Sequence, residues 1–209
     1  MPTLASSRTR DILKLAVPAL GALAAEPTYL LVDTAIIGHL GTTQLAALAL
    51  AATFLASAFW FFNFLAYGTT AQVARLHGAK DLPGIATATA QALWLAVAIG
   101  VAISALGVVL APQIVELLQG EGAVAAKATT YMRISFLAAP FVMVVLAGEG
   151  YARGVQRMNV PLKILVVSNV ANAILDVTFV YGLDMDLAGS AWGTVIAQAG
   201  AAAAFAIVL

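Results

Sequence analysis

Residues 84–111 read GIATATAQALWLAVAIGVAISALGVVLA, a run without a single charged side chain. A helix of roughly 20 predominantly apolar residues is long enough to cross the hydrocarbon core of a bilayer. Similar runs recur along the chain, in which 62% of the 209 residues are hydrophobic and only 10% are charged. A soluble domain of this length could not keep so much apolar surface away from water. The sequence therefore predicts an all-α, polytopic bundle of transmembrane helices.

Six transmembrane helices are expected, separated by short turns that are polar or rich in Gly and Pro. Alanine and glycine are frequent in them, which favours close approach of the helix backbones. The last apolar run reaches Leu209 without a polar or basic flank, so we expect one lobe, 1–209, that is half of a longer protein or a unit that pairs with a second copy. The predicted ranges are 12–37, 45–73, 84–111, 123–151, 160–183 and 188–209.

The distribution of basic residues predicts the orientation. Lysine and arginine gather in the N-terminal segment and in the second and fourth loops, whereas the first and fifth loops have none. This bias places both termini in the cytoplasm. The apolar run continues to Ile37, beyond a candidate cleavage site at Ala22–Ala24, so we expect a retained first helix and not a cleaved signal peptide. The residues assigned to the cytoplasmic side are Arg8, Arg10, Lys14, Arg75, Lys80, Arg153, Arg157 and Lys163.

Composition argues against several functional classes. The net charge is zero and no basic block occurs, so nucleic acid is not an expected partner. Cysteine is absent, which excludes disulfides, thiolate metal sites and a cysteine nucleophile. His39 and His77 fall in expected loops without a second metal ligand at a suitable spacing. No Ser–His or Ser–Lys dyad and no HExxH motif is suggested, so neither an enzyme nor an organic cofactor is expected.

Three acidic residues lie well inside the expected helices. Asp176 interrupts the stretch NAILDVTFVYG (172–182), and Glu26 and Asp33 lie seven residues apart in the first helix. A charge at the bilayer centre costs roughly 2.5–3.5 kcal/mol on insertion scales, so such residues face the protein interior or a water-filled cavity. We expect Glu26 to be a second protonation site or a contact for a cationic substrate.

Helix geometry predicts that four polar residues meet at similar depth. With a rise of about 1.5 Å per residue, Asp33 lies roughly 9 Å, and Asp176 and Thr194 roughly 12 Å, from the outer ends of their helices. Asn172 shares a helix face with Asp176. Carboxylate, amide and hydroxyl oxygens suit a hard cation, and two acids in a low-dielectric site can share a proton. The alternative is that Asn172 and Asp176 only link helices through hydrogen bonds.

Four stretches resemble the MATE (multidrug and toxic compound extrusion) transporters and occur in the order found in that family. The first and last are most similar to its DNA-damage-inducible subgroup. The resemblance covers nearly the whole chain and implies the N-terminal six-helix lobe of a twelve-helix transporter, whose second lobe is absent from this chain. The stretches are EPTYLLVDTAIIGHLGTTQLAAL (26–48), GTTAQVARLHGAKD (68–81), YARGVQRMNVPLKI (151–164) and NVANAILDVTFVYGLDMDLAGSAWGTVIAQ (169–198).

The resemblance also implies roles for individual residues. It places a site for the coupling ion, H⁺ or Na⁺, in this lobe. Pro18 matches a proline at which the first helix of some members bends, because proline removes a backbone hydrogen bond. Pro27 adds a second weak point in the same helix. The residues that match the family's ion site are Asp33, Asn172, Asp176 and Thr194.

We therefore expect a secondary active transporter that exports organic cations or amphiphilic drugs across the bacterial inner membrane in exchange for H⁺ or Na⁺. The expected partners are the lipid bilayer, the second lobe or a second copy of the chain, and the substrate. Two alternatives stay open at this point: a flippase for a lipid-linked substrate, and a non-transporting membrane fragment or scaffold.

Overall fold

The computed structural model describes residues 16–17, 20–21, 23–24, 27–28 and 30–209. These residues form helices and turns without any strand, which confirms the all-α prediction. Residues 30–38 are helical, as are the described positions before them, and this segment is called the first helix below. The later elements are α2 (Thr42–Phe61), α3 (Phe64–Gly78), α4 (Leu82–Leu117), α5 (Gly122–Phe136), α6 (Ala139–Gly154), α7 (Asn159–Val177), the π-helical turn η1 (Thr178–Gly182) and α8 (Asp186–Val208).

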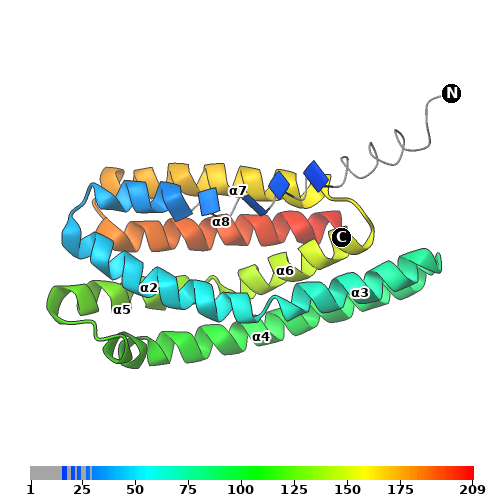
Figure 1. Cartoon of the computed structure of the whole chain (residues 1–209), viewed down its shortest axis with the longest axis horizontal. Coiled ribbons are helices and arrows are strands. Elements are labelled where there is room, and N and C mark those ends of the chain that lie inside the picture. Colours follow the sequence, from blue (N-terminus) through cyan, green and yellow to red (C-terminus); the bar gives the residue numbers. More distant parts are fainter. Residues whose placement is uncertain (1–15, 18–19, 22, 25–26, 29) are drawn as a thin grey trace.

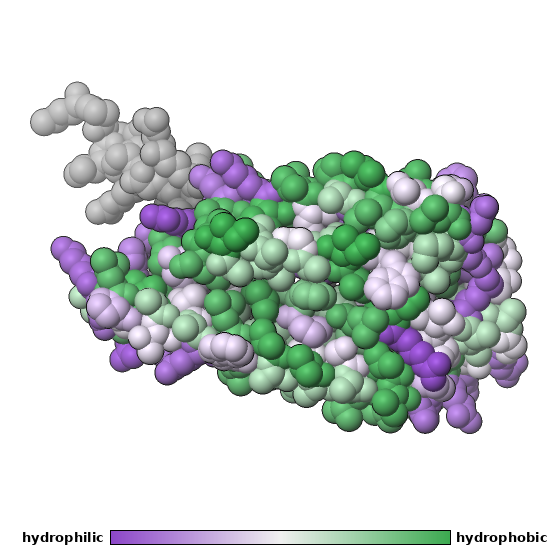
Figure 2. Space-filling view, turned by 180° about the vertical axis from the view of Figure 1, so that it is seen from behind, coloured by the Kyte–Doolittle hydropathy of each residue, from purple (hydrophilic) through white to green (hydrophobic). Residues whose placement is uncertain are grey.

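Several helical segments are long and apolar enough to cross a membrane. In the described part of the chain there are four, namely Thr42–Gly78, Leu82–Leu117, Asn159–Gly182 and Asp186–Val208. The pair α5 and α6 would make a fifth, with a bend of 50°. Figure 2 shows apolar side chains over the middle of the molecule and hydrophilic side chains gathered toward its two ends. The chain is therefore an integral, multi-pass membrane protein, whereas the sixth span, in the first helix, stays a prediction.

The helix expected over 45–73 is divided in the structure. Phe62 and Asn63 separate α2 from α3, and the Asn63 side chain donates from Nδ2 to the Trp60 carbonyl at 3.0 Å. An asparagine that bonds to a nearby carbonyl competes with the regular helical pattern. The continuous apolar run concealed this interruption from sequence analysis.

The single helix predicted over 123–151 is two helices in the structure. α5 ends at Phe136 and α6 begins at Ala139, with the 50° bend between them. Pro140 explains the bend, because proline has no N–H to donate to the carbonyl four residues earlier. α4 packs directly on the bend, since a Cβ on Gly100 would lie 2.3 Å from the Pro140 Cα.

α4 runs six residues beyond the expected end at residue 111. Its start is fixed by Asp81, whose side chain accepts a hydrogen bond from the Gly84 amide at 2.9 Å. Pro112 lies inside the helix and does not end it. Residues 114–117 are therefore the last turn of α4.

α6 is the centre of the bundle. It packs against α3 and α4 on one side and against α8 on the other, as Figure 1 shows. Glycines allow this proximity: a Cβ on Gly150 would lie 2.6 Å from the Ala66 carbonyl oxygen of α3, and one on Gly148 would lie 2.5 Å from the Phe205 ring of α8. α7 and η1 pack against α8, and the first helix joins them there through Asp33 and Ile36.

The turns alternate between two ends of the bundle. The turns near 79–81 and 155–158 lie at one end, here called the basic end because it carries Arg75, Lys80, Arg153 and Arg157. The turns near 39–41, 118–121 and 183–185 lie at the other, here called the acidic end because it carries Glu116, Glu121, Asp184 and Asp186.

Candidate functional site

The first helix contributes one buried acid to the bundle interior. Asp33 is 1% exposed, although its neighbours Leu31 and Val32 are 71% and 39% exposed. Its Oδ1 accepts a hydrogen bond of 2.6 Å from the Ser190 hydroxyl of α8, a residue that is itself fully buried. This distance is at the short end of the usual range for a hydroxyl donor and an oxygen acceptor. Asp33 therefore faces α8 and not the lipid.

α7 contributes the second acid and its amide neighbour. Asp176 is fully buried and Asn172 is 3% exposed. The Asn172 Nδ2 donates to Asp176 Oδ1 at 3.2 Å and lies 3.4 Å from Thr194 Oγ1 of α8. Because a helix has about 3.6 residues per turn, a spacing of four places Asn172 and Asp176 one above the other on the same face. The expected group of polar residues on α7 and α8 is thus present as a contiguous cluster.

A glycine of α8 makes room for Asp176. A Cβ on Gly193 would lie 2.1 Å from Asp176 Oδ1 and 3.3 Å from its backbone nitrogen. The other carboxylate oxygen, Oδ2, is buried and accepts no hydrogen bond from the described residues. Because buried polar atoms normally have a partner, Oδ2 is an oxygen that a cation or a proton could occupy.

The two acids share one low-dielectric region. Asp33 bonds to Ser190 of α8, and Asp176 packs against Gly193 three residues later, so both buried acids lie against the same stretch of α8. Two carboxylates at such a site repel each other unless a proton or a cation lies between them. The oxygen donors around them are hydroxyls and carboxylates, which suit a hard cation such as Na⁺ as well as a proton. The amide of Asn172, expected to present its oxygen, presents its nitrogen to Asp176 here.

The remaining residues of the predicted site are placed as follows. Pro18 and Glu26 lie outside the described residues. Pro27 lies in the first helix and is exposed, so it is not in contact with the buried cluster. The structure thus brings the residues assigned to the coupling ion together around residues 190–194 of α8; they are Asp33, Asn172, Asp176 and Thr194.

Sequence analysis missed two residues of this cluster, Ser190 and Gly193. Ser190 precedes Thr194 by four residues, so helical spacing alone places both hydroxyls on one face of α8. That spacing could have identified the serine. Gly193 carried no comparable signal, because its importance depends on the approach of α7.

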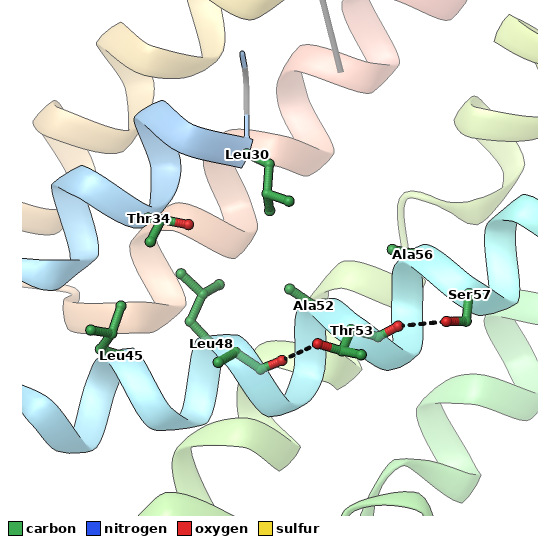
Figure 3. Close-up of a pocket in the computed structure, with 9 residues that line it drawn as sticks. Leu30, Thr34, Leu45, Leu48, Ala52, Thr53, Ala56 and Ser57 are labelled. Atoms are coloured by element: carbon green, nitrogen blue, oxygen red, sulfur yellow. Dashed lines mark hydrogen bonds between the residues drawn. The ribbon is translucent and has the colours of Figure 1, made fainter. Parts of the chain in front are cut away.

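A groove of about 380 Å³ lies between the first helix and α2 (Figure 3). Most of its lining is apolar, with three hydroxyl residues, Thr34, Thr53 and Ser57. Thr53 and Ser57 donate their protons to carbonyls of their own helix, at 2.7 and 2.9 Å. The groove therefore presents apolar surface with hydroxyl oxygens as acceptors. Its other lining residues are Leu30, Leu45, Leu48, Ala49, Ala52 and Ala56.

Comparison with known proteins agrees with this arrangement. A family model described as MatE matches residues 18–178. The chain belongs to the MatE family. This MatE chain is 34% identical to the DNA damage-inducible protein F of Escherichia coli over 194 residues, which are 92% of the chain and 42% of that protein. It is 26% identical to the multidrug export protein MepA of Staphylococcus saprophyticus, over 97% of the chain and 45% of that protein.

A solved structure has the same fold as this MatE chain. The crystal structure of MATE in complex with MaL6 superposes with a TM-score of 0.88 at 24% sequence identity, over 95% of the chain and 44% of that protein. The chain thus spans less than half the length of the relatives and of the structure it matches. It corresponds in fold to one half of such a transporter.

Proposed function

We propose that this chain is the ion-coupled N-terminal half of an exporter of amphiphilic organic cations, driven by entry of H⁺ or Na⁺. The observation that carries the proposal is the pair of buried acids, Asp33 and Asp176, which come from two separate helices and contact Ser190 and Gly193 of α8. A bundle that only needed stability would not bury two acids without a basic partner, because each costs free energy in the membrane.

The proposed coupling works through the first helix. When a cation or a proton neutralises the pair, Asp33 and Asp176 can approach; when it leaves, their charges repel. Asp33 belongs to a helix whose other side chains in this region are mostly exposed, so that helix is the element most easily displaced. We propose that Pro18 and Pro27 are the positions at which the helix bends.

The groove between the first helix and α2 supports the proposed substrate class. Movement of the first helix would change the groove directly, since Leu30 and Thr34 form one of its walls. An amphiphilic cation could place apolar rings on the leucine and alanine side chains and polar groups on the hydroxyl oxygens. The relative named multidrug export protein agrees with such a substrate. Glu26 is proposed as a second acidic contact for the cation.

The orientation is proposed from the charges at the two ends. The basic end carries the turns with Arg75, Lys80, Arg153 and Arg157, and basic turns remain on the cytoplasmic side. Both termini would then be cytoplasmic in a bacterial inner membrane. The second half of the transporter, whether a further part of the protein or a second copy, would complete the path for the substrate.

The proposal is tested with Asp176→Asn in the protein as its host expresses it. Export of an ethidium-like cation should be lost while membrane insertion is retained, because the amide cannot bind a proton or balance the charge of Na⁺. The matched control is Asp184→Asn, an exposed acid at the acidic end whose φ of 51° asparagine also tolerates. Export by Asp176→Asn at the rate of the control contradicts the assignment.

The same assay identifies the ion and tests the main rival. Export is measured against separately imposed pH and Na⁺ gradients, and the gradient that sustains it identifies the coupling ion. A parallel arm presents a lipid-linked molecule in place of the organic cation. Movement of the lipid alone would favour a flippase, and movement of neither would favour a scaffold.

A further inference from the structure

The first helix has little apolar contact with the rest of the described chain near Asp33. Only Asp33 and Ile37 are buried between residues 30 and 38, and most of the other side chains there are exposed. Apolar packing therefore holds this segment mainly at its end, where Ile37 belongs to the buried core and Ile36 and Leu40 pack against it. Near Asp33, the position of the segment depends on the hydrogen bonds it makes to its neighbours.

Two side chains from other helices donate hydrogen bonds to this segment. The Ser190 hydroxyl of α8 donates to Asp33 Oδ1 at 2.6 Å. The Tyr181 hydroxyl of η1 donates to the Ile36 carbonyl at 2.5 Å. The two donors come from elements on either side of the turn at 183–185, so they bind the first helix at two successive places, one turn apart.

The Tyr181 hydroxyl bonds to a carbonyl near the end of the first helix that has no amide partner in the following turn. The Leu40 amide donates to Ile37 and not to Ile36, because the helix tightens as it ends. The last carbonyls of a helix need an outside donor, and in a membrane an unsatisfied carbonyl is especially costly. His39 supplies such a bond to Ala35, through Nδ1 at 2.7 Å, and Tyr181 supplies one to Ile36.

The π-helical turn aims Tyr181 at the first helix. Five residues along a regular α-helix would turn Tyr181 about 140° away from Asp176, at 100° per residue. η1 begins at Thr178, and the Leu183 amide bonds to the Thr178 carbonyl at 3.0 Å, five residues earlier. The wider turn reduces the rotation per residue, so Tyr181 returns toward the side of α7 that carries Asp176. Such π-turns occur frequently at functional sites.

We propose that Ser190 and Tyr181 are positioning residues that hold the first helix against α8 and η1 so that Asp33 faces Asp176. The inference rests on the proposed role of Asp33 in ion coupling and assigns a role to two residues outside the ion site itself. Ser190 acts on the carboxylate directly, and Tyr181 acts through the end of the helix. Loss of either hydrogen bond lets the first helix leave its place against α8 and η1 more often. Loss of the Ser190 bond increases this movement more, because that bond is fully buried and is made to a carboxylate.

Residues 1–209 contain no cysteine, which allows a direct measurement of the position of the first helix. Ile37→Cys, made with any cysteine outside these residues replaced by serine, introduces a single thiol at a position that is fully buried near the acidic end. Its rate of labelling by a maleimide reports how often this part of the helix leaves the bundle. We expect Ser190→Ala to raise the rate about tenfold or more, as for a hydrogen bond to a charged group. Tyr181→Phe should raise it about threefold, as for an average bond in a membrane protein.

Two control variants match these substitutions. Ser168→Ala removes a buried hydroxyl that bridges α7 and α8 through the Ala197 carbonyl at 3.0 Å. Tyr67→Phe removes a phenolic hydroxyl from an exposed position on α3. Both controls should leave the labelling rate within about twofold of the parent, because neither hydroxyl donates a hydrogen bond to the described residues of the first helix.

A second readout distinguishes positioning from plain structural support. The ion concentration for half-maximal export is measured in Ser190→Ala and Tyr181→Phe and in the two control variants. A positioning role predicts that Ser190→Ala and Tyr181→Phe each shift this concentration and that the controls do not. A rise in labelling without any shift in the ion dependence would overturn the positioning role, as would labelling at the control rate.

The two readouts separate this inference from the proposed function. If Asp33→Asn leaves the ion dependence unchanged, the proposed coupling role fails. The labelling rates then decide alone whether the two hydrogen bonds hold the first helix, because labelling does not require transport.

Discussion

Gly193→Ala should disable the candidate site while leaving the bundle folded. The new Cβ would lie 2.1 Å from Asp176 Oδ1, whereas its distances to the Asp176 Cγ and backbone nitrogen, 3.3 Å each, are tight but tolerable. The carboxylate oxygen must therefore move by about 1 Å to reach normal contact distance. That movement breaks or lengthens the bond from Asn172, which already measures 3.2 Å.

The expected loss of affinity for the coupling ion is worked out from these contacts. Overpacking of a well-packed interior costs about 1–3 kcal/mol. Because the atom displaced is the end of a side chain and not a backbone atom, most of that cost falls on the position of the carboxylate and not on the helix packing. A loss of about 2 kcal/mol at the ion site corresponds to roughly a 30-fold weaker apparent affinity for the coupling ion.

The assay is export at increasing concentration of the coupling ion, with thermal unfolding measured on the same preparation. The control is Gly200→Ala on the same helix, where an added Cβ meets no atom within 4 Å. We expect a shift of roughly 30-fold in the ion dependence for Gly193→Ala and little change for the control. Identical ion dependence in the two variants would refute the reasoning, because Asp176 would then not need the space that Gly193 provides.

Two further predictions concern stability. Gly150→Ala should destabilise the bundle by about 1–3 kcal/mol, because the new Cβ would lie 2.6 Å from a backbone carbonyl oxygen of α3. Thermal unfolding checks this against Gly68→Ala, an open position on α3, and equal unfolding midpoints for the two variants would contradict it. Lys127→Ala removes the ion pair with Asp186, in which both side chains are about one-third exposed, so it should lower the free energy of unfolding by less than about 1 kcal/mol. A decrease of several kcal/mol at physiological salt would contradict the description of this pair as a surface contact.

The membrane class and the buried acids of the candidate site followed from local features of the sequence. Apolar runs such as 84–111 identify membrane helices because a bilayer requires continuous apolar surface over a fixed length. Asp33 and Asp176 were identifiable because an acid inside such a run is costly wherever it lies. Their relative depth followed from the constant rise of the helix.

The helix breaks were less predictable. Pro140 is visible in the sequence, but Pro112 is equally visible and leaves α4 intact to Leu117. The difference lies in the surroundings of each proline, where α4 packs its Gly100 onto the bend at Pro140. Proline weakens a helix locally, and the neighbouring helices decide whether the helix bends there.

The sequence by itself determined that this is an all-helical membrane chain with acids held inside its spans, because burial in lipid and helical periodicity are properties of each segment alone. Only the tertiary structure decided that Ser190 donates a hydrogen bond to Asp33, that Gly193 leaves space for Asp176 and that Tyr181 donates a hydrogen bond to the first helix. Those relations depend on the approach and rotation of helices far apart in the chain, and no single helix contains that information.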